Sequence, residues 1–193
     1  SCGGGNNPTL KNEIDKFSFA TDGNATDVGD LTVARRYAAG QSSSTHGYCS
    51  GGNPISNVID KFTFASDANA TDVGDLTVAR RELVGQSSTT HGYSSGGGPT
   101  YNIIEKFSFT VDGNATDVGD LTAGRHNAAG QNSTTHGYTS GGWPSPNANI
   151  IDKFSFATDG NATDVGDLTV GRSYTAGQSS STHGYTSGGA NPY

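Results

Sequence analysis

The chain has 193 residues, of which 31% are hydrophobic and 29 are glycine, and its formal net charge at neutral pH is −7. The acidic balance argues against nucleic acid as a partner, because neutralising phosphates requires clustered Lys and Arg. No apolar run is long enough to span a bilayer. The low fraction of apolar residues also favours many short strands, each burying a thin layer, over a single thick core.

Three sequence markers recur at one spacing along the chain. The Lys before a Phe stands at positions 16, 61, 106 and 153, an Arg stands at 35, 80, 125 and 172, and the His of "THGY" stands at 46, 91, 136 and 183. Each series steps by 45, 45 and 47 residues, a period typical of solenoids, propellers and repeat arrays. We therefore expect a single repeat domain over residues 1–193, with units at 1–35, 36–80, 81–125, 126–172 and 173–193.

The unit at 36–80 predicts four short strands. "RYAAGQSSST" is small and polar, and "YCSGG" follows the turn signal at His46 and ends in two glycines. "NVIDKFTFA" is the most apolar run and places Phe62 and Phe64 on one face. The turn "SDANA", which contains Asp-Gly in the other copies, precedes the last strand, "TDVGDLTVAR"; Asp-Gly between strands is a strong hairpin signal.

Four antiparallel strands in about 45 residues are typical of one blade of a β-propeller. We therefore predict an all-β fold, a β-propeller of four four-stranded blades. Residues 10–32 would supply strands three and four of a mixed blade, and residues 173–189 strands one and two, so that strands from both termini close the ring. An open β-repeat stack is the alternative. Because the chain starts and ends in the same segment of the unit and contains no Met, we also expect it to be a window of a longer array.

The order of these features resembles the kelch repeat, with its double glycine, aromatic third strand and fourth strand that closes on Arg. The kelch Trp is replaced here by Ala25, Ala70, Ala115 and Ala162, so other residues must fill the space between blades. The near-identical tandem units also resemble predicted repeat proteins of marine bacteriophages. This resemblance implies a structural or interaction module of a virion or an extracellular protein.

The turn "DGNATDVGD" is a candidate calcium loop, similar to those of integrin-type propellers. Calcium binds six to eight oxygens, and the first loop offers those of Asp22, Asn24, Thr26 and Asp30. The equivalent oxygens belong to Asp67, Asn69, Thr71, Asp75, Asp112, Asn114, Thr116, Asp120, Asp159, Asn161, Thr163 and Asp167. Asp27 stands where such a loop needs Gly, and the alternative is an Asx turn at a hairpin tip, with Asp27 or Asp30 pairing Arg35.

Catalysis has no support in the sequence. No "GxSxG" or other nucleophile motif occurs, and acid pairs such as Asp27 and Asp30 recur in every unit, whereas a catalytic pair is usually unique. We therefore expect a protein that is not an enzyme and needs no cofactor other than the candidate calcium. Cys2 and Cys49 lie near the same point of successive units, which is usually too far apart for a disulfide.

The copies differ mainly just after each Arg and after each double glycine. The first set comprises Arg36, Tyr37, Glu82, Leu83, His126, Asn127, Ser173 and Tyr174. Variable segments on a rigid scaffold carry recognition, so we predict that Tyr37, Tyr174 and Trp143 contribute to a surface for a protein or glycan partner. One alternative for these aromatics is that they pack under loops and the chain self-assembles with like chains. The alternative functions are a carbohydrate-binding head of a phage fibre or adhesin, and a calcium-stabilised extracellular repeat.

Overall fold

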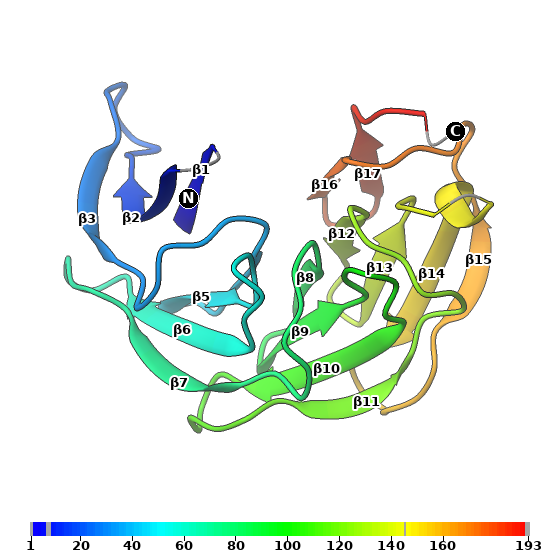
Figure 1. Cartoon of the computed structure of the whole chain (residues 1–193), viewed down its shortest axis with the longest axis horizontal. Helices are drawn as coiled ribbons and strands as arrows, with labels where there is room; N and C mark the ends of the chain where they lie inside the picture. Colours follow the sequence, from blue (N-terminus) through cyan, green and yellow to red (C-terminus); the bar gives the residue numbers. More distant parts are fainter. Residues whose placement is uncertain (1, 7–8, 145, 192–193) are drawn as a thin grey trace.

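The computed structural model describes residues 2–6, 9–144 and 146–191, which form five antiparallel sheets in chain order (Figure 1). The first sheet contains β1 (Cys2–Asn6), β2 (Thr9–Lys16) and β3 (Thr26–Asp30). The second contains β4 (Ala39–Ser42), β5 (His46–Ser50), β6 (Val58–Thr63) and β7 (Thr71–Asp75). The third contains β8 (Val84–Ser87), β9 (His91–Ser95), β10 (Ile103–Ser108) and β11 (Thr116–Asp120). The fourth contains β12 (Ala129–Asn132), β13 (His136–Ser140), β14 (Ile150–Ser155) and β15 (Thr163–Asp167), and the fifth β16 (Ala176–Ser179) and β17 (Gly184–Ser187).

The four-strand pattern predicted for each complete unit is confirmed in the second, third and fourth sheets, where consecutive strands pair as antiparallel neighbours. The first sheet contains one strand more than expected, because the glycine-rich segment at the start of the chain forms β1. The described part of the chain also contains one short 3-10 turn, η1 (Asn147–Asn149). No helix among these residues is long and apolar enough to cross a membrane.

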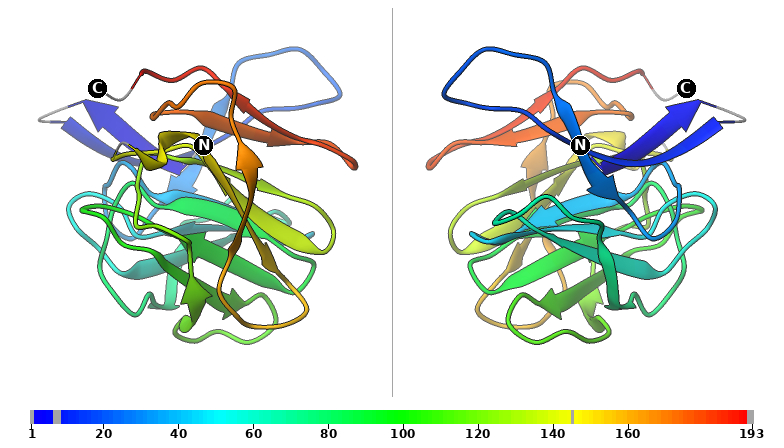
Figure 2. Two further views of the ribbon diagram at one scale, coloured as in Figure 1. Left: turned by 90° about the vertical axis from the view of Figure 1, so that its right-hand side faces the viewer. Right: turned by 90° about the vertical axis from the view of Figure 1, so that its left-hand side faces the viewer.

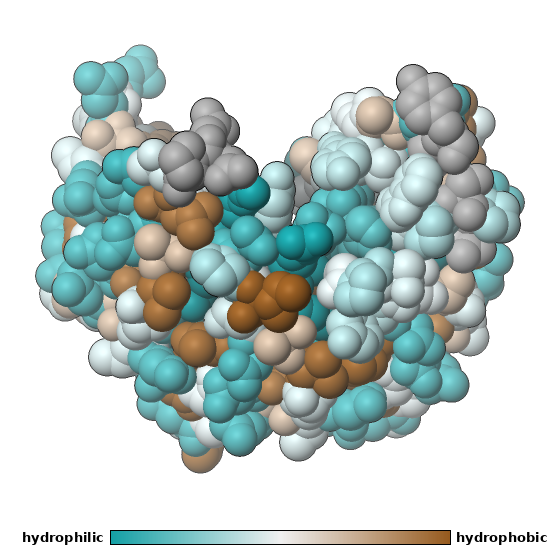
Figure 3. Space-filling model, viewed as in Figure 1, coloured by the Kyte–Doolittle hydropathy of each residue, from teal (hydrophilic) through white to brown (hydrophobic). Residues whose placement is uncertain are grey.

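The sheets follow an open arc, and the prediction of a closed four-bladed propeller is wrong. The first and fifth sheets end the arc on the same side of the molecule (Figures 1 and 2), and a deep notch separates them in the space-filling view (Figure 3). The strands from the two termini stay in separate sheets of three and two strands instead of sharing one. A ring of four units needs a sharper turn from each sheet to the next than the contacts between these sheets produce.

Backbone contacts set the spacing between neighbouring sheets. A Cβ atom on Gly74 of β7 would overlap the carbonyl oxygen of Gly113 in the third sheet, and one on Gly85 of β8 would overlap that of Gly40 in β4. Only glycine allows the two backbones to approach so closely. The sheets are therefore in backbone contact at both their outer and their inner strands.

The hydrophobic core lies between sheets. Tyr48 of β5 stacks on Phe109 of the third sheet with ring centroids 4.8 Å apart, and Tyr93 of β9 stacks on Phe156 of the fourth sheet at 4.7 Å. Offset aromatic contacts at this distance add to the stability gained from burial. These rings pack near small residues such as Ala115, which is buried where a kelch repeat has Trp.

Buried ion pairs join three of the four closing arginines to the third strand of the next sheet. The pairs, whose side chains are 0% exposed, are Arg35–Asp60, Arg80–Glu105 and Arg125–Asp152. Asp60 also accepts hydrogen bonds from the backbone N–H of Thr32 at 3.1 Å and from its hydroxyl at 2.7 Å. The predicted pairing of Arg35 with an acid of its own unit is therefore wrong. The ion pair holds one sheet to the next instead.

Candidate functional site

The first strands of four sheets are neighbours in chain order: β4 lies beside β8, β8 beside β12 and β12 beside β16. Figure 1 shows β8, β12 and β16 on the inner side of the arc. At the ends of these strands a cavity of about 790 Å³ is lined largely by Ser, Thr, Asn and Gln. The backbone N–H of Ser42 donates to Ser87 Oγ at 3.0 Å, and that of Asn132 donates to Ser179 Oγ at 3.0 Å. These repeated hydroxyl groups thus serve in part to connect neighbouring strands.

Just before the same strands, the residues that follow each closing Arg by two positions come together. We call Tyr37, Glu82, Asn127 and Tyr174 the axial ring. Their φ angles are 59°, 58°, 53° and 58°, all in the left-handed region. The N–H groups of Glu82, Asn127 and Tyr174 donate to the carbonyl of the preceding ring residue at 2.8, 3.1 and 2.8 Å. One backbone conformation, linked from sheet to sheet, therefore presents side chains of three different types.

The side chains of the axial ring combine two exposed aromatics with a fixed carboxylate. Tyr37 is 47% exposed and Tyr174 67% exposed, and a hollow of about 160 Å³ lies among the ring residues. Glu82 Oε2 lies 2.8 Å from His126 Nδ1 and 3.4 Å from Asn127 Nδ2. The carboxylate is thus held in place by its neighbours, and both tyrosines stay partly accessible, with the Arg36 guanidinium 4.9 Å from the centroid of the Tyr37 ring.

Trp143, the third predicted recognition residue, lies beside the axial ring. Its backbone N–H donates to the carbonyl of His126 at 2.8 Å and its carbonyl accepts from the N–H of His126 at 2.9 Å. Its side chain is 37% exposed. The structure thus brings Tyr37 and Tyr174 into one ring and places Trp143 next to the residue that precedes Asn127. The binding role of all three stays a prediction.

Sequence reasoning placed Glu82 and Asn127 among the variable residues but did not select them for the site. Their shared left-handed backbone is what groups them with the two tyrosines. Asn is enriched in that conformation, whereas bulky side chains adopt it rarely. Equal positions in the repeat, occupied by unlike residues, are the sequence signal that identifies all four.

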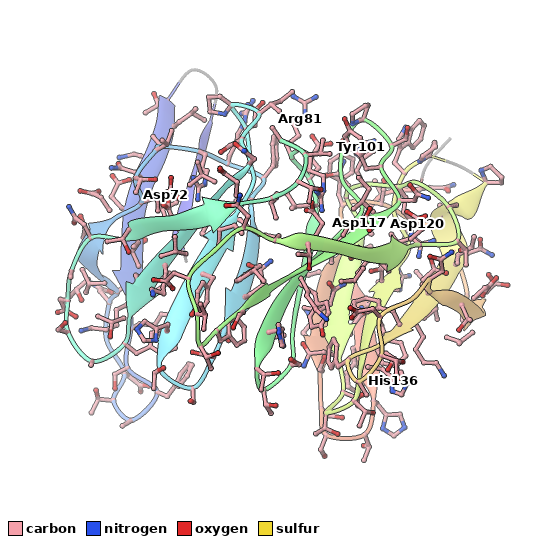
Figure 4. The ribbon with its side chains drawn as sticks, turned by 90° about the horizontal axis from the view of Figure 1, so that it is seen from below. Asp72, Arg81, Tyr101, Asp117, Asp120 and His136 are labelled. Carbon is pink, nitrogen blue, oxygen red and sulfur yellow. The ribbon has the colours of Figure 1, made fainter. Side chains whose placement is uncertain are left out.

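The candidate calcium loops make contacts between sheets. Asp67 pairs with Lys16, and Asp112 pairs with Lys61 at 2.5 Å. Asn69 Oδ1 accepts the backbone N–H of Asp30 at 3.0 Å, and Asn114 and Asn161 accept equivalent bonds from Asp75 and Asp120. Figure 4 shows Asp117 and Asp120 near the outer strand β11, away from His136. Among the described residues no group of three or more His, Cys, Asp or Glu is placed to hold a metal ion, and calcium stays a prediction.

The two cysteines do not define a site. Cys49 is fully buried in the cluster between the first and second sheets, near Ile14 and Leu31. The side chain of Cys2 lies outside the part of the chain that the structure describes.

No protein family matches the chain, and no curated protein matches it. The resemblance to kelch repeats and to phage repeat proteins therefore stays a prediction from the sequence.

Proposed function

We propose that the chain is a non-enzymatic binding module whose axial ring, together with Trp143, recognises its partner. The observation that supports this proposal is that one shared backbone conformation carries different side chains. Tyr37, Glu82, Asn127 and Tyr174 share a left-handed conformation and a continuous set of backbone hydrogen bonds, yet they are three residue types. A purely structural ring gains nothing from this variety or from two exposed tyrosines.

The chemistry of the ring favours a carbohydrate. A tyrosine ring offers a flat apolar face and a polar hydroxyl, which suits the alternating C–H and O–H groups of a sugar. The Glu82 carboxylate, already oriented by His126, retains oxygen lone pairs that accept hydrogen bonds from sugar hydroxyls. Binding sites commonly combine aromatic walls with a few fixed polar groups in this way. A peptide partner uses the same faces and is the second outcome to test.

The test is a glycan array followed by calorimetry with the best ligand, and a peptide library in parallel. Changing Tyr37 and Tyr174 together to Ala should weaken binding about tenfold or more, since aromatic anchors carry much of the binding energy of an interface. Val111→Ala is the control, because Val111 is an exposed apolar residue that lies outside the ring. Equal affinity of the double variant and the control variant would reject the proposal.

The proposed cellular setting rests on the sequence resemblance alone. The likeness to phage repeat proteins supports a virion-associated or extracellular role, as part of a longer repeat protein. A calcium-stabilised extracellular repeat is the competing function. It predicts a higher melting temperature in millimolar calcium than in chelator, because an ion that binds only the folded state stabilises it.

A further inference from the structure

Two interfaces inside the chain share one aromatic arrangement. A tyrosine from the second strand of one sheet packs against two phenylalanines of the following sheet, one in the third strand and one just after it. Tyr48 lies 5.4 Å from Phe107 and 4.8 Å from Phe109, measured between ring centroids. Tyr93 lies 5.5 and 4.7 Å from the corresponding pair in the fourth sheet. The repeat therefore shows which side chain this phenylalanine pair accepts.

The equivalent place between the first and second sheets is a pocket of about 420 Å³. Its apolar lining consists of Ile14, Phe17, Phe19, Val28, Phe62, Phe64 and Ala68. Phe62 and Phe64 occupy the positions of Phe107 and Phe109, and among the described residues no tyrosine lines this pocket. The pocket thus has the chemistry of a tyrosine site.

The matching tyrosine is exposed at the other end of the arc. Tyr185 of β17 is 54% exposed, whereas Tyr93, at the same position of the repeat, is 1% exposed. In its sheet β17 pairs only with β16 among the described strands, so one edge of its backbone is open. Open strand edges are templates for pairing with another chain.

The strand register of the complete sheets predicts which residues β17 would face in a third strand. In the second sheet, the second-strand residue Tyr48 faces Lys61 of the third strand. The corresponding residues are Tyr185 in β17 and Lys16 in β2. β1 pairs with β2 from Thr9 as far as Ile14, which faces Cys2. β17 can therefore pair only with the Lys16 end of β2, and its pairing must end before Ile14.

We propose that this chain assembles head to tail: β17 of one copy pairs with the Lys16 end of β2 in a second copy, and Tyr185 enters the pocket on Phe62 and Phe64. Charges at the two ends agree with this contact. Lys106 of the third sheet pairs with Asp159 of the fourth at 2.6 Å, and the equivalent partners across the copies are Lys153 and Asp22. The new contact repeats an interface that the chain already forms internally.

The contact also covers apolar surface on the fourth sheet. Val165 of β15 is exposed, whereas its equivalents Val73 and Val118 are partly buried against the next sheet. Leu168 is likewise more exposed than Leu121, which is buried. Because the two joined surfaces differ, the interface is heterologous, and copies add one after another until a ring or an open fibre results.

The experiment is light scattering coupled to size exclusion, over a wide range of protein concentration. The unmodified chain should rise in mass with concentration. Tyr185→Asp disables only the donor end and Phe19→Asp only the acceptor end. Each variant should remain a single chain, because one of its two contact ends is disabled. Neither substitution should disturb the fold, because Tyr185 is half exposed and Phe19 is 98% exposed. Circular dichroism verifies this.

Mixing the two variants gives the decisive result. One partner retains an acceptor end and the other a donor end, so the mixture should form a one-to-one dimer and no larger species. Tyr174→Asp is the control, since it alters the axial ring and should leave association unchanged even where ligand binding is lost. Three results would overturn the proposal: a single-chain mass for the unmodified protein at every concentration, association that neither end variant reduces, or a mixture that stays monomeric.

Discussion

The contacts between sheets and the axial ring treat the repeat in opposite ways. Between sheets the same residue types recur at equal positions, as the buried pairs Arg35–Asp60 and Arg125–Asp152 illustrate. In the axial ring, equal positions carry Tyr37, Glu82 and Asn127. Assembly of the arc thus depends on side chains that recur with little change, such as Glu105 in place of Asp in one pair, whereas the ring is held by its backbone and leaves its side chains free to differ. Substitutions in the two regions should therefore have separable effects.

Among the substitutions considered, Arg80→Ala should lower the free energy of unfolding most. It leaves the Glu105 carboxylate buried without its cation, and removal of one partner of a buried pair costs about 3–5 kcal/mol. Urea denaturation should show a loss of that size in the free energy of unfolding. Arg81→Ala is the adjacent control. Arg81 is exposed, and exposed ion pairs contribute about 0–1 kcal/mol. Similar losses for both variants would mean that the ion pair does not join the sheets.

The aromatic contact gives the next largest effect. Tyr93→Ala removes a buried ring that packs on Phe154 and Phe156, and deleting a large buried aromatic costs about 3 kcal/mol or more. Tyr185→Ala, at the same position of the repeat, should change the stability of the monomer by about 0.5 kcal/mol or less, since exposed sites contribute little. Dilute samples and thermal unfolding measure both. A loss for Tyr185→Ala as large as that for Tyr93→Ala would show that position in the repeat outweighs burial.

At the axial ring we expect a substitution that stabilises the folded chain. A left-handed backbone costs a non-glycine residue about 1–2 kcal/mol, and Gly loses about 0.5–1 kcal/mol of that gain through its greater freedom in the unfolded chain. Tyr174→Gly should therefore raise the free energy of unfolding by about 0.5–1 kcal/mol, because φ is 58° there. The same variant should weaken ligand binding. Denaturation and calorimetry on one sample would check both, and lower stability would contradict the strain argument.

The smallest expected effect is a loss of stability in mildly acidic solution. Burial lowers the pKa of His91, nearby Lys106 lowers it further, and Asp159 opposes them. Because the folded-state pKa is below the unfolded value of about 6.5, protonation favours the unfolded chain. The associated stability is present above pH 6.5 and is lost as the pH falls below it. His91→Gln should flatten this part of the stability curve between pH 7.5 and 5; an unchanged curve would exclude His91 as its source.

The sequence predicted the local structure well, because local structure depends on neighbouring residues. Alternating apolar positions around Phe62 predicted β6, and the repeated turns before Thr71 and Thr116 predicted the start of the outer strands. The variable residues after each Arg also predicted Tyr37 and Tyr174, which the fold brings into one ring. Their grouping required only that equal positions of a repeat lie at equal places in successive sheets.

Relations between units were harder to predict. Acidic residues recur with the same period at the positions of Asp27, Asp30 and Asp60, so spacing alone could not show that Arg35 pairs with Asp60. The prediction of a closed ring was wrong for a related reason. The turn from sheet to sheet depends on contacts whose small differences add along the chain, and a period of 45 residues fits many curvatures. The pocket lined by Phe62 and Phe64 likewise depended on knowing which surfaces stay uncovered.

The glycines at the sheet contacts have a mechanical consequence. Where Gly74 meets Gly113 and Gly85 meets Gly40, backbone touches backbone, and a mutation of a surface side chain cannot change the distance between them. These contacts act as spacers that fix the curvature contributed by each unit. Duplication or loss of a whole unit should therefore lengthen or shorten the arc along one constant circle. Substitution of a single spacer glycine should instead wedge two sheets apart and tilt everything beyond that point, which small-angle scattering would detect as a change in overall shape.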